Sequence, residues 1–315
     1  MQEPSIDHTA DEWYEQAKTI VIQRQSVSIS LIQRHLRIGY SIALSLMERL
    51  EADGIVTSLM PLGGRQLTSS YRRNHSMQAH MNPNLIEMLD KFYGCEGGDA
   101  GNATSPTIWL FGLEPGWSKR DQKRAESPSG QEDDGYSVET QLGWVYNRKA
   151  FKLFAAIDGI PVSRYREFAF ERRPFERGSS GYFKGNLYPY ACTDLAHWPE
   201  DAVEETGLTS KAEYQAWCAQ YRWPAIKNWV DEHQPKLFIG VGNSFRTDFA
   251  LSVFGYDLES EYHEILINGY RKKIYLSQFD GRKLAVVPHF SGRNGLNSDA
   301  AIEQAGALIS DFLQR

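Results

Sequence analysis

From residue 83 onward, short and continuously apolar runs alternate with amphipathic segments of helical length. The apolar runs occupy residues 107–112 (TIWLFG), 235–242 (PKLFIGVG) and 282–290 (RKLAVVPHF), and the amphipathic segments include 144–157, 244–255 and 298–315. Strands that are apolar on both faces are typical of parallel sheets, because their connections place helices over each face. The pattern predicts an α/β fold with a mostly parallel sheet sandwiched by helices.

The first seventy residues have a different pattern, with three helical segments followed by two short strands. Helices are predicted at 11–25, 29–38 and 40–54, and residues 55–68 (IVTSLMPLGGRQLT) indicate two strands around a Pro/Gly turn. Three helices and a hairpin predict a small winged helix-turn-helix domain over residues 1–70. The polar stretch after it predicts a linker over 71–82, so that the α/β domain covers 83–315. A helical domain used only for packing or dimerisation is the alternative.

The composition limits the kinds of partner and cofactor. The net charge is -6, so any contact with nucleic acid must use local basic patches. Cys95, Cys192 and Cys218 form no CxxC pair, which disfavours a zinc or iron–sulfur site and fits reduced thiols. The polar start is unlike a secretory signal, and no apolar run approaches membrane-spanning length. We therefore expect a cytoplasmic protein with no metal, no cofactor and no membrane partner.

Two strand ends carry polar residues of a kind that suits catalysis. The first strand runs into Gly112, Leu113, Glu114, Pro115 and Gly116, where the glycines allow close backbone approach and the proline fixes the turn. The last strand delivers His289 onto a polar loop. A carboxylate facing an imidazole across the edge of a sheet suits hydrolytic chemistry. The alternatives are that Glu114 only caps a helix and that the histidine is structural.

These strand ends resemble the two signature motifs of the uracil-DNA glycosylase superfamily. In that family a strand is followed by a Gly-x-(Asp/Asn)-Pro-(Tyr/Gly) turn, to which residues 112–116 correspond, with Glu114 at the position of the water-handling residue. A later strand is followed by His-Pro-Ser-Pro, continuing as Arg-Asn in the single-strand-selective class, to which 289–294 (HFSGRN) correspond. Between them, 185–191 (GNLYPYA) resembles the segment whose Asn hydrogen-bonds the flipped pyrimidine, which points to Asn186.

The resemblance covers residues 82–315 and implies a role for each matched residue. Glu114 is expected to stabilise positive charge on the sugar and orient water, and His289 to stabilise negative charge on the departing base. Trp117 or Tyr146 is a candidate to stack on the extruded base, with core packing as the alternative. The expected base pocket comprises Gly112, Leu113, Pro115, Gly116, Trp117, Asn186 and Tyr188. The residues expected to hold the distorted DNA are Ser291, Arg293, Asn294 and Leu296.

Three departures from the family motifs bear on the substrate. Glu114 is one methylene longer than the usual Asp or Asn, and Phe290 and Gly292 replace both prolines of the second motif. These changes put uracil itself in doubt. They fit a larger, modified pyrimidine, or a pocket that binds a base without cutting.

The segment SISLIQRHLRIGYSIALSLMERLEADGIV resembles the winged-helix gamma domain of the FtsK DNA translocase. That family's recognition helix carries Asn-Arg and a second Arg where this chain has Ser41, Ile42 and Ser45. Arginine forks read guanine edges in the major groove, so the resemblance implies that the fold is kept and the sequence specificity is lost. An exposed Ile42 would suit a protein-binding or dimerising face. The remaining DNA-contact candidates, with solvated surface as the alternative, are Arg34, Arg37, Ser41, Arg65, Arg72 and Arg73.

Taken together, the sequence favours a monofunctional DNA glycosylase that is tethered to DNA by a winged helix. Its expected partner is double-stranded DNA with a flipped pyrimidine, or single-stranded DNA, in repair or in defence against phage DNA. One alternative is a non-catalytic regulator whose glycosylase-like domain senses a nucleobase or nucleotide. A third is a protein that works through protein partners and hardly binds DNA.

Overall fold

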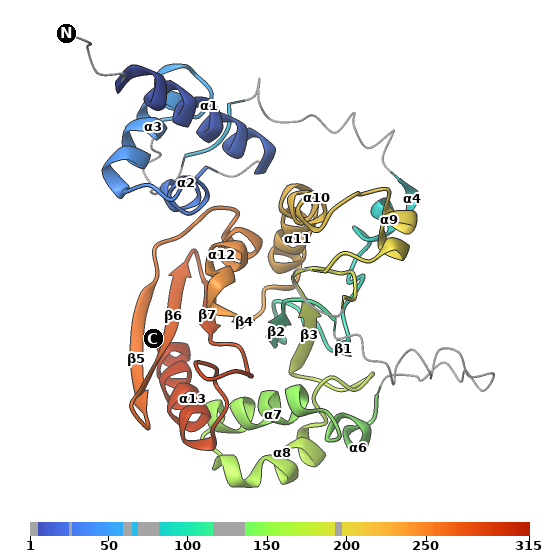
Figure 1. The fold of residues 1–315 in the computed structure, drawn as a ribbon. Coiled ribbons are helices and arrows are strands. Elements are labelled where there is room, and N and C mark those ends of the chain that lie inside the picture. Colours follow the sequence, from blue (N-terminus) through green and yellow to red (C-terminus); the bar gives the residue numbers. More distant parts are fainter. Residues whose placement is uncertain (1–5, 25–26, 59–64, 69–81, 116–135, 193–196) are drawn as a thin grey trace.

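The computed structural model describes residues 6–24, 27–58, 65–68, 82–115, 136–192 and 197–315, and shows a small helical domain beside a larger α/β domain (Figure 1). The small domain contains three helices, α1 (Ile6–Arg24), α2 (Ile29–Leu36) and α3 (Tyr40–Ala52). Val56 and Leu67 then pair in an antiparallel bridge, which confirms the predicted hairpin. The domain has its own apolar core, to which Ile32, Leu46 and Leu50 contribute.

The two ends of α2 explain where that helix stops and starts. Ser28 has extended backbone angles, and its side chain accepts a hydrogen bond from the backbone N–H of Leu31 at 3.0 Å. This satisfies one of the amides that a helix leaves unpaired at its first turn. At the other end Arg37 is left-handed, with φ 54°. The chain therefore turns sharply between α2 and α3, as in a helix-turn-helix.

The α/β domain contains one sheet and helices on both of its faces. Its strands are β1 (Gly97–Gly98), β2 (Ile108–Gly112), β3 (Tyr182–Asn186), β4 (Leu237–Val241), β5 (Glu261–Ile267), β6 (Tyr270–Phe279) and β7 (Arg282–Val287). Its helices are α4 (Pro83–Glu87), α6 (Val138–Gln141), α7 (Val145–Ile157), α8 (Tyr165–Arg172), α9 (Glu200–Thr206), α10 (Lys211–Trp217), α11 (Trp223–His233), α12 (Arg246–Phe254) and α13 (Asp299–Gln314). Short 3-10 or π-helical turns are η2 (Val162–Arg164), η3 (Cys218–Arg222) and η4 (Asn243–Phe245).

The sheet is mixed, which corrects the prediction of a mostly parallel one. Its strand order is β1-β3-β2-β4-β7-β6-β5. The four central strands, β3, β2, β4 and β7, are parallel, whereas β1 at one edge and β6 and β5 at the other are antiparallel to their neighbours. Three of the central strands, β2, β4 and β7, are the ones that the sequence identified by their continuous apolar runs, because strands covered on both faces are apolar on both.

Alternate residues of the central strands build two apolar layers. Ile108 and Leu110 of β2 pack in the layer that includes α7 and α13, and Trp109 and Phe111 pack in the layer that includes α11 and α12. In the first layer α7 and α13 cross closely at Gly306, where a Cβ atom would collide with Ala156. The sheet is therefore sandwiched by helices, as predicted.

The hairpin of β5 and β6 was not predicted from the sequence. Asn268 and Gly269 at its turn both have positive φ, 50° and 79°, as a two-residue hairpin turn requires. β6 pairs with β7 only from Tyr275 onward, so its first residues continue past the carboxyl end of β7. None of the helices in the described ranges is long and apolar enough to cross a membrane.

Candidate functional site

The order of the parallel strands identifies one edge of the sheet as the place for a ligand. Along the chain β2 comes first, β3 then lies on one side of it, and β4 and β7 lie on the other. In such sheets the connections diverge above the first strand and leave a crevice at the carboxyl ends of the strands. Here the connections diverge between β2, which ends at Gly112, and β4, which ends at Val241, so we expect the crevice there.

The same edge brings together the strand ends that carry the predicted site residues. Gly112 and Asn186 are partners in the parallel register of β2 and β3. Beyond the strands, the backbone N–H of Leu187 donates to the carbonyl of Gly112 at 3.0 Å, so the two ends stay joined. β7 ends at Val287, two residues before His289, on the other side of β4.

Glu114 lies in a buried ion pair. Its carboxylate contacts the ammonium of Lys211, the first residue of α10, and the two side chains are only 6% and 8% exposed. The Lys211 ammonium also lies 5.4 Å from the ring centroids of Trp198 and Tyr214. Burial of both charges makes the pair costly to break from either side. The sequence did not predict Lys211, because its partner is almost a hundred residues away.

His289 has a defined tautomer. Its Nδ1 accepts a hydrogen bond from the backbone N–H of Ser291 at 3.2 Å and lies 2.8 Å from the Ser291 hydroxyl. An Nδ1 that accepts from an amide leaves the proton of the neutral ring on Nε2. Desolvation, and then the neighbouring Lys149 cation, lower the pKa of His289 below its ordinary value. The imidazole is therefore neutral at neutral pH and offers Nε2–H as a donor.

Two lysines hold the loop that follows His289. The Lys149 ammonium donates to the carbonyl of Phe290 at 2.6 Å. Lys272 of β6 is buried, and its ammonium donates to the carbonyl of Gly295 at 2.5 Å. Arg293 itself is exposed, and its guanidinium donates to the Tyr270 hydroxyl at 2.6 Å and lies over that ring. The loop is therefore surrounded by cations, which suits an anionic ligand.

Tyr146 of α7 lies between His289 and Asn186. Its ring centroid is 6.4 Å from that of His289 and 5.0 Å from that of Phe290. A Cβ atom added to Gly112 would lie 3.1 Å from the Tyr146 hydroxyl and 2.8 Å from Asn186 Oδ1, so glycine is needed there for space. Burial, and then the Glu96 carboxylate, raise the pKa of Tyr146, which keeps the phenol protonated.

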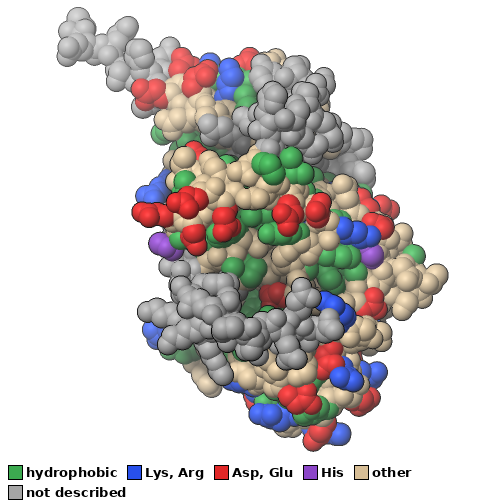
Figure 2. Space-filling model, turned by 90° about the vertical axis from the view of Figure 1, so that its right-hand side faces the viewer, with side chains coloured by type: hydrophobic (Ala, Val, Ile, Leu, Met, Phe, Trp, Pro, Cys, Tyr) green, Lys and Arg blue, Asp and Glu red, His purple; other side chains and the backbone are tan. Residues whose placement is uncertain are grey.

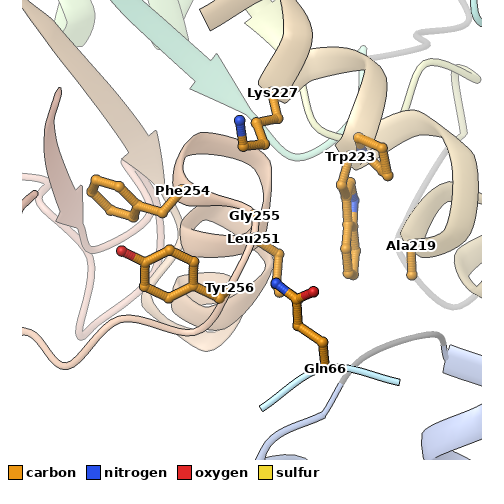
Figure 3. A pocket seen from close by; sticks show the side chains of 9 residues that line it. Gln66, Ala219, Trp223, Lys227, Leu251, Phe254, Gly255 and Tyr256 are labelled. Carbon is orange, nitrogen blue, oxygen red and sulfur yellow. The ribbon is translucent and has the colours of Figure 1, made fainter. Parts of the chain in front are cut away.

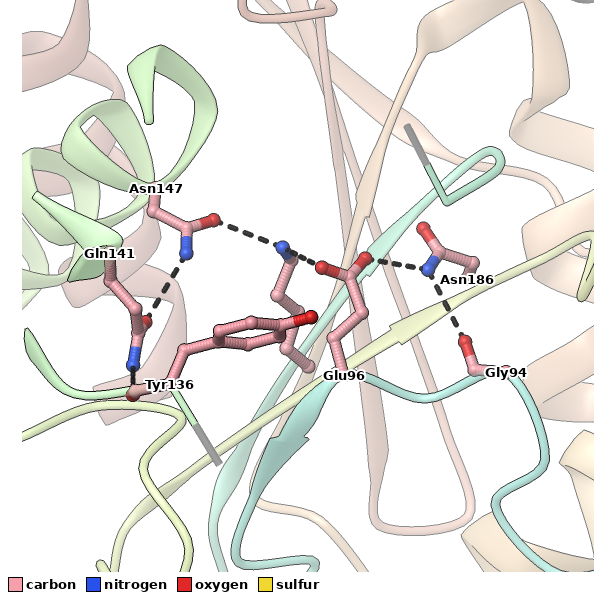
Figure 4. Close-up of polar contacts among 7 residues, drawn as sticks. Gly94, Glu96, Tyr136, Gln141, Asn147 and Asn186 are labelled. Carbon is pink, nitrogen blue, oxygen red and sulfur yellow. Dashed lines mark hydrogen bonds and ion pairs between the residues drawn. The ribbon is translucent and has the colours of Figure 1, made fainter. Parts of the chain in front are cut away.

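Asn186 belongs to a chain of polar contacts that runs beneath this edge (Figure 4). Its Nδ2 donates to Glu96 Oε1 at 2.8 Å and to the carbonyl of Gly94 at 3.3 Å. The other Glu96 oxygen is paired with the ammonium of Lys184, which also donates to Asn147 Oδ1 at 3.0 Å. Figure 4 shows Asn186 Oδ1 directed away from Glu96. Neither Glu96 nor Lys184 was predicted from the sequence.

The other predicted base-site residues differ in exposure. Leu113 packs in the core beside Gly242, and Tyr188 is buried with its ring near Tyr214 and Phe245. Leu296 is fully buried in the core, so its side chain is not available to a DNA strand in this structure. Pro115 is partly buried, and Gly116 and Trp117 lie outside the described residues. Ser291 and Asn294 are exposed on the loop after His289.

In the small domain the predicted DNA-contact residues are spread over different surfaces. Arg34 and Arg37 are exposed on and after α2, and Ser41 is exposed in the first turn of α3. Ile42 is 40% exposed and Tyr40 is 59% exposed on α3. Arg65 Nε lies 2.9 Å from Glu51 Oε2, and the Arg65 side chain is 14% exposed. Its charge is therefore paired within the domain. Arg72 and Arg73 lie outside the described residues.

A cavity of about 400 Å³ lies between the two domains (Figure 3). It is lined by Trp223, Leu251, Phe254 and Tyr256 from the α/β domain and by Gln66 from the small domain. Lys227, the one cation among its described lining residues, is paired with Asp231 at 2.5 Å. Neither Glu114 nor His289 is among its described lining residues. Among the described side chains, no group of three or more His, Cys, Asp or Glu residues is placed to hold a metal ion.

The three helices and the hairpin match a protein-family model, described as the Ftsk gamma domain, over residues 8–69. Residues 8–69 are an FtsK gamma domain. Similar proteins include the DNA translocase FtsK 2 of Ralstonia nicotianae, 39% identical over 69 residues, which are 22% of this chain and 9% of that protein. The DNA translocase FtsK 1 of Neisseria meningitidis serogroup B is 45% identical over 64 residues, 20% of this chain and 8% of that protein. The chain thus spans less than a tenth of these relatives.

Proposed function

We propose that this protein is a DNA glycosylase that hydrolyses the N-glycosidic bond of a pyrimidine in DNA and leaves an abasic site. The observation that supports the proposal is that Asn186 ends β3 while Glu114 and His289 each follow a parallel strand by two residues, so that all three lie at the carboxyl ends of the parallel strands. A carboxylate, an amide and a neutral imidazole are the groups that this reaction needs for the sugar, for recognition of the base and for the departing charge.

Each group has a defined task in the proposed reaction. His289 Nε2–H donates to a carbonyl oxygen of the base and stabilises the negative charge that develops there. The Glu114 carboxylate stabilises positive charge on the sugar and orients the attacking water. Lys211 pairs with the Glu114 carboxylate and fixes its position. The cations beside the loop, Lys149 and Arg293, attract the DNA backbone.

The FtsK gamma domain supports DNA as the substrate. Its relatives are named DNA translocases, and we propose that this domain tethers the glycosylase domain to duplex DNA. A tether raises the local concentration of substrate without new contacts at the site. The exposed side of α4 and α9 carries an acidic band, visible in Figure 2, so the DNA path avoids that side.

The test is release of free base from oligonucleotides that each carry one uracil or one 5-modified pyrimidine. We expect mass spectrometry to detect the free base and alkali to cleave the strand at the resulting abasic site. Glu114→Gln and His289→Gln should each lower the rate by at least about a hundredfold, because one placed group of this kind contributes roughly 2.7–4 kcal/mol.

Two substitutions on exposed surfaces serve as matched controls. Glu303→Gln, exposed on α13, and His263→Gln, half-buried on β5 and paired with Glu261, change the same residue types at positions outside the candidate site and should keep full activity. Far-UV circular dichroism checks that each variant is folded. The proposal fails if wild-type protein releases no base from any oligonucleotide, or if the site variants are as active as the controls.

A second candidate function rests on the buried ion pair of Glu114. A carboxylate that is already neutralised by Lys211 suits a ligand contact as well as a catalytic group. The protein would then be a non-catalytic DNA-binding regulator that senses a nucleobase or nucleotide. Thermal stabilisation by a nucleotide, with no base release from any oligonucleotide, is the result that favours this candidate.

A further inference from the structure

The polar chain around Asn186 fixes which end of its amide faces a ligand. Both hydrogen atoms of Nδ2 have partners that can only accept, the carboxylate oxygen of Glu96 and the carbonyl of Gly94. Rotating the amide by 180° would place Oδ1 against two acceptors. The Nδ2 group is therefore unable to face the crevice, and Oδ1 is the only polar atom of Asn186 left for a ligand.

The far end of the chain agrees with this orientation. The carbonyl of Tyr136 accepts from Gln141 Nε2 at 2.7 Å, so Gln141 Oε1 must accept from Asn147 Nδ2, at 3.2 Å. Asn147 Oδ1 then accepts from the Lys184 ammonium, which is also paired with Glu96. Every amide in the chain thus has one permitted direction, set at each end by a backbone carbonyl.

Tyr146 adds a donor beside this acceptor. Its hydroxyl is buried and has no hydrogen-bond partner among the described residues. It lies next to Gly112 and Asn186 Oδ1, while its ring lies beside His289. Across the edge of the sheet the site therefore presents, in order, the Nε2–H donor of His289, the O–H donor of Tyr146 and the Oδ1 acceptor of Asn186.

We propose that this order of groups selects a 4-aminopyrimidine, that is, a base of the cytosine type. The pairing edge of such a base presents two acceptors, O2 and N3, and then the 4-amino donor, which complements donor, donor, acceptor. The edge of a uracil-type base presents acceptor, donor, acceptor, which leaves its N3–H facing the Tyr146 hydroxyl and its O4 facing Asn186 Oδ1. This inference rests on the proposed function and assigns its substrate class. Glu96 and Lys184 are positioning residues, because they act only through Asn186.

The test compares two bases that differ only in this edge, 5-hydroxymethylcytosine and 5-hydroxymethyluracil. Each is placed in the same duplex opposite a reduced abasic analogue, so that neither base is paired and flipping costs the same. We expect the full-length protein to release the cytosine-type base about 10- to 100-fold faster, because the other base leaves buried polar groups unpaired. Binding to duplexes with the corresponding 2′-fluoro nucleotides should show the same order without turnover.

Two variants separate selection from simple structural support. In Glu96→Gln, the new amide turns its oxygen to Lys184 and its NH2 to Asn186. This replaces the closer of the two acceptors of Nδ2 with a donor and leaves only the carbonyl of Gly94 to oppose a flip of Asn186 that presents Nδ2. We expect the ratio of the two rates to fall by at least about tenfold in favour of the uracil type. Tyr146→Phe removes the middle donor and should slow release of the cytosine type more than of the uracil type. The matched control Glu87→Gln on exposed α4 should leave the ratio unchanged.

The outcomes distinguish the two proposals. Release and binding that favour the uracil type, or are equal for both bases, overturn the inference and leave the glycosylase function intact. An unchanged ratio in Glu96→Gln, with both rates lowered equally, also overturns the inference, because it assigns Glu96 a purely structural role. No release of either base, with 2′-fluoro duplexes bound no better than unmodified duplex, overturns the proposed function.

Discussion

Lys211 and Glu114 show how much the candidate site depends on one pair of residues. Both side chains are almost fully buried, so each charge has lost its water and depends on the other. Removing one partner of such a pair leaves an uncompensated charge, whereas replacing both with neutral groups of similar size often costs little. Substitutions of these two residues therefore test the ion pair through its effect on stability, whether or not the protein catalyses the proposed reaction.

We predict that Lys211→Met lowers the free energy of unfolding of the α/β domain by about 3–5 kcal/mol, because Glu114 is left charged and buried. Glu114→Gln should lower the free energy of unfolding by a similar amount, because Lys211 is then left charged and buried. In the double variant the two costs should not add, and the coupling should be at least about 1 kcal/mol. Urea unfolding followed by tryptophan fluorescence measures all three. Strictly additive costs would contradict the ion pair.

At the scale of elements, the sequence predicted what periodicity and turn chemistry can show. The apolar runs predicted three of the four central strands, β2, β4 and β7, and Gly112, Glu114 and His289 were recognised because they lie at or just after the end of a strand. The hairpin of β5 and β6 was missed, because its exposed face carries both polar and apolar residues. Neither strand alone has a sequence pattern that predicts its antiparallel partner. The sequence did not predict the residues that hold Asn186 and Glu114 in place, which are Glu96, Lys184 and Lys211. Most of these contacts join residues that are far apart in the sequence, and glutamate and lysine usually lie on surfaces.

We propose that the FtsK gamma domain contacts DNA through the outer face of α3. Its outer face exposes Tyr40, Ser41, Ile42 and Ser45 and has no arginine in its first turns. We predict that Ser41→Arg with Ser45→Arg strengthens binding to duplex DNA and steepens the dependence on salt by about 0.9 per new phosphate contact. Fluorescence anisotropy over a salt series measures both. Gln304→Arg with Gln314→Arg on α13 adds the same charge elsewhere, and an equal gain in that variant would show that net charge alone is responsible.

At the scale of the whole molecule, the two domains meet near Asp257, which follows α12. Desolvation raises the pKa of the Asp257 carboxyl, and the opposing influences include Arg246 first and then, from the small domain, Arg34 and Ser28. Thr247 of α12 also contacts this carboxylate, at 3.3 Å. The folded protein therefore binds a proton at Asp257 more tightly than the unfolded chain does. It follows that the ionised carboxylate costs stability at neutral pH.

The sign of this shift gives a pH-dependent prediction. Stability that Asp257 contributes is fully present below its unfolded pKa, about 3.9, and is lost as the pH rises through its higher folded pKa. Asp257→Asn should therefore raise the Tm at pH 7, and the difference from wild type should vanish near pH 4. Thermal melts across this range measure it. The control Asp311→Asn on exposed α13 should show no such trend, and a lower Tm for Asp257→Asn at pH 7 would refute the assignment.

The relay of side chains from Tyr136 to Gly94 has a consequence for how such a protein diversifies. Lys184 can only donate, so it fixes Asn147 whatever Asn186 does, whereas the orientation of Asn186 depends on Glu96 and the carbonyl of Gly94. Under the base selection that we propose, an inherited change at Glu96, which is not one of the three groups that would meet the base, would alter which atom of Asn186 faces the base. Related proteins could then differ in the base that they select through a substitution at Glu96, while Glu114 and His289 stay unchanged.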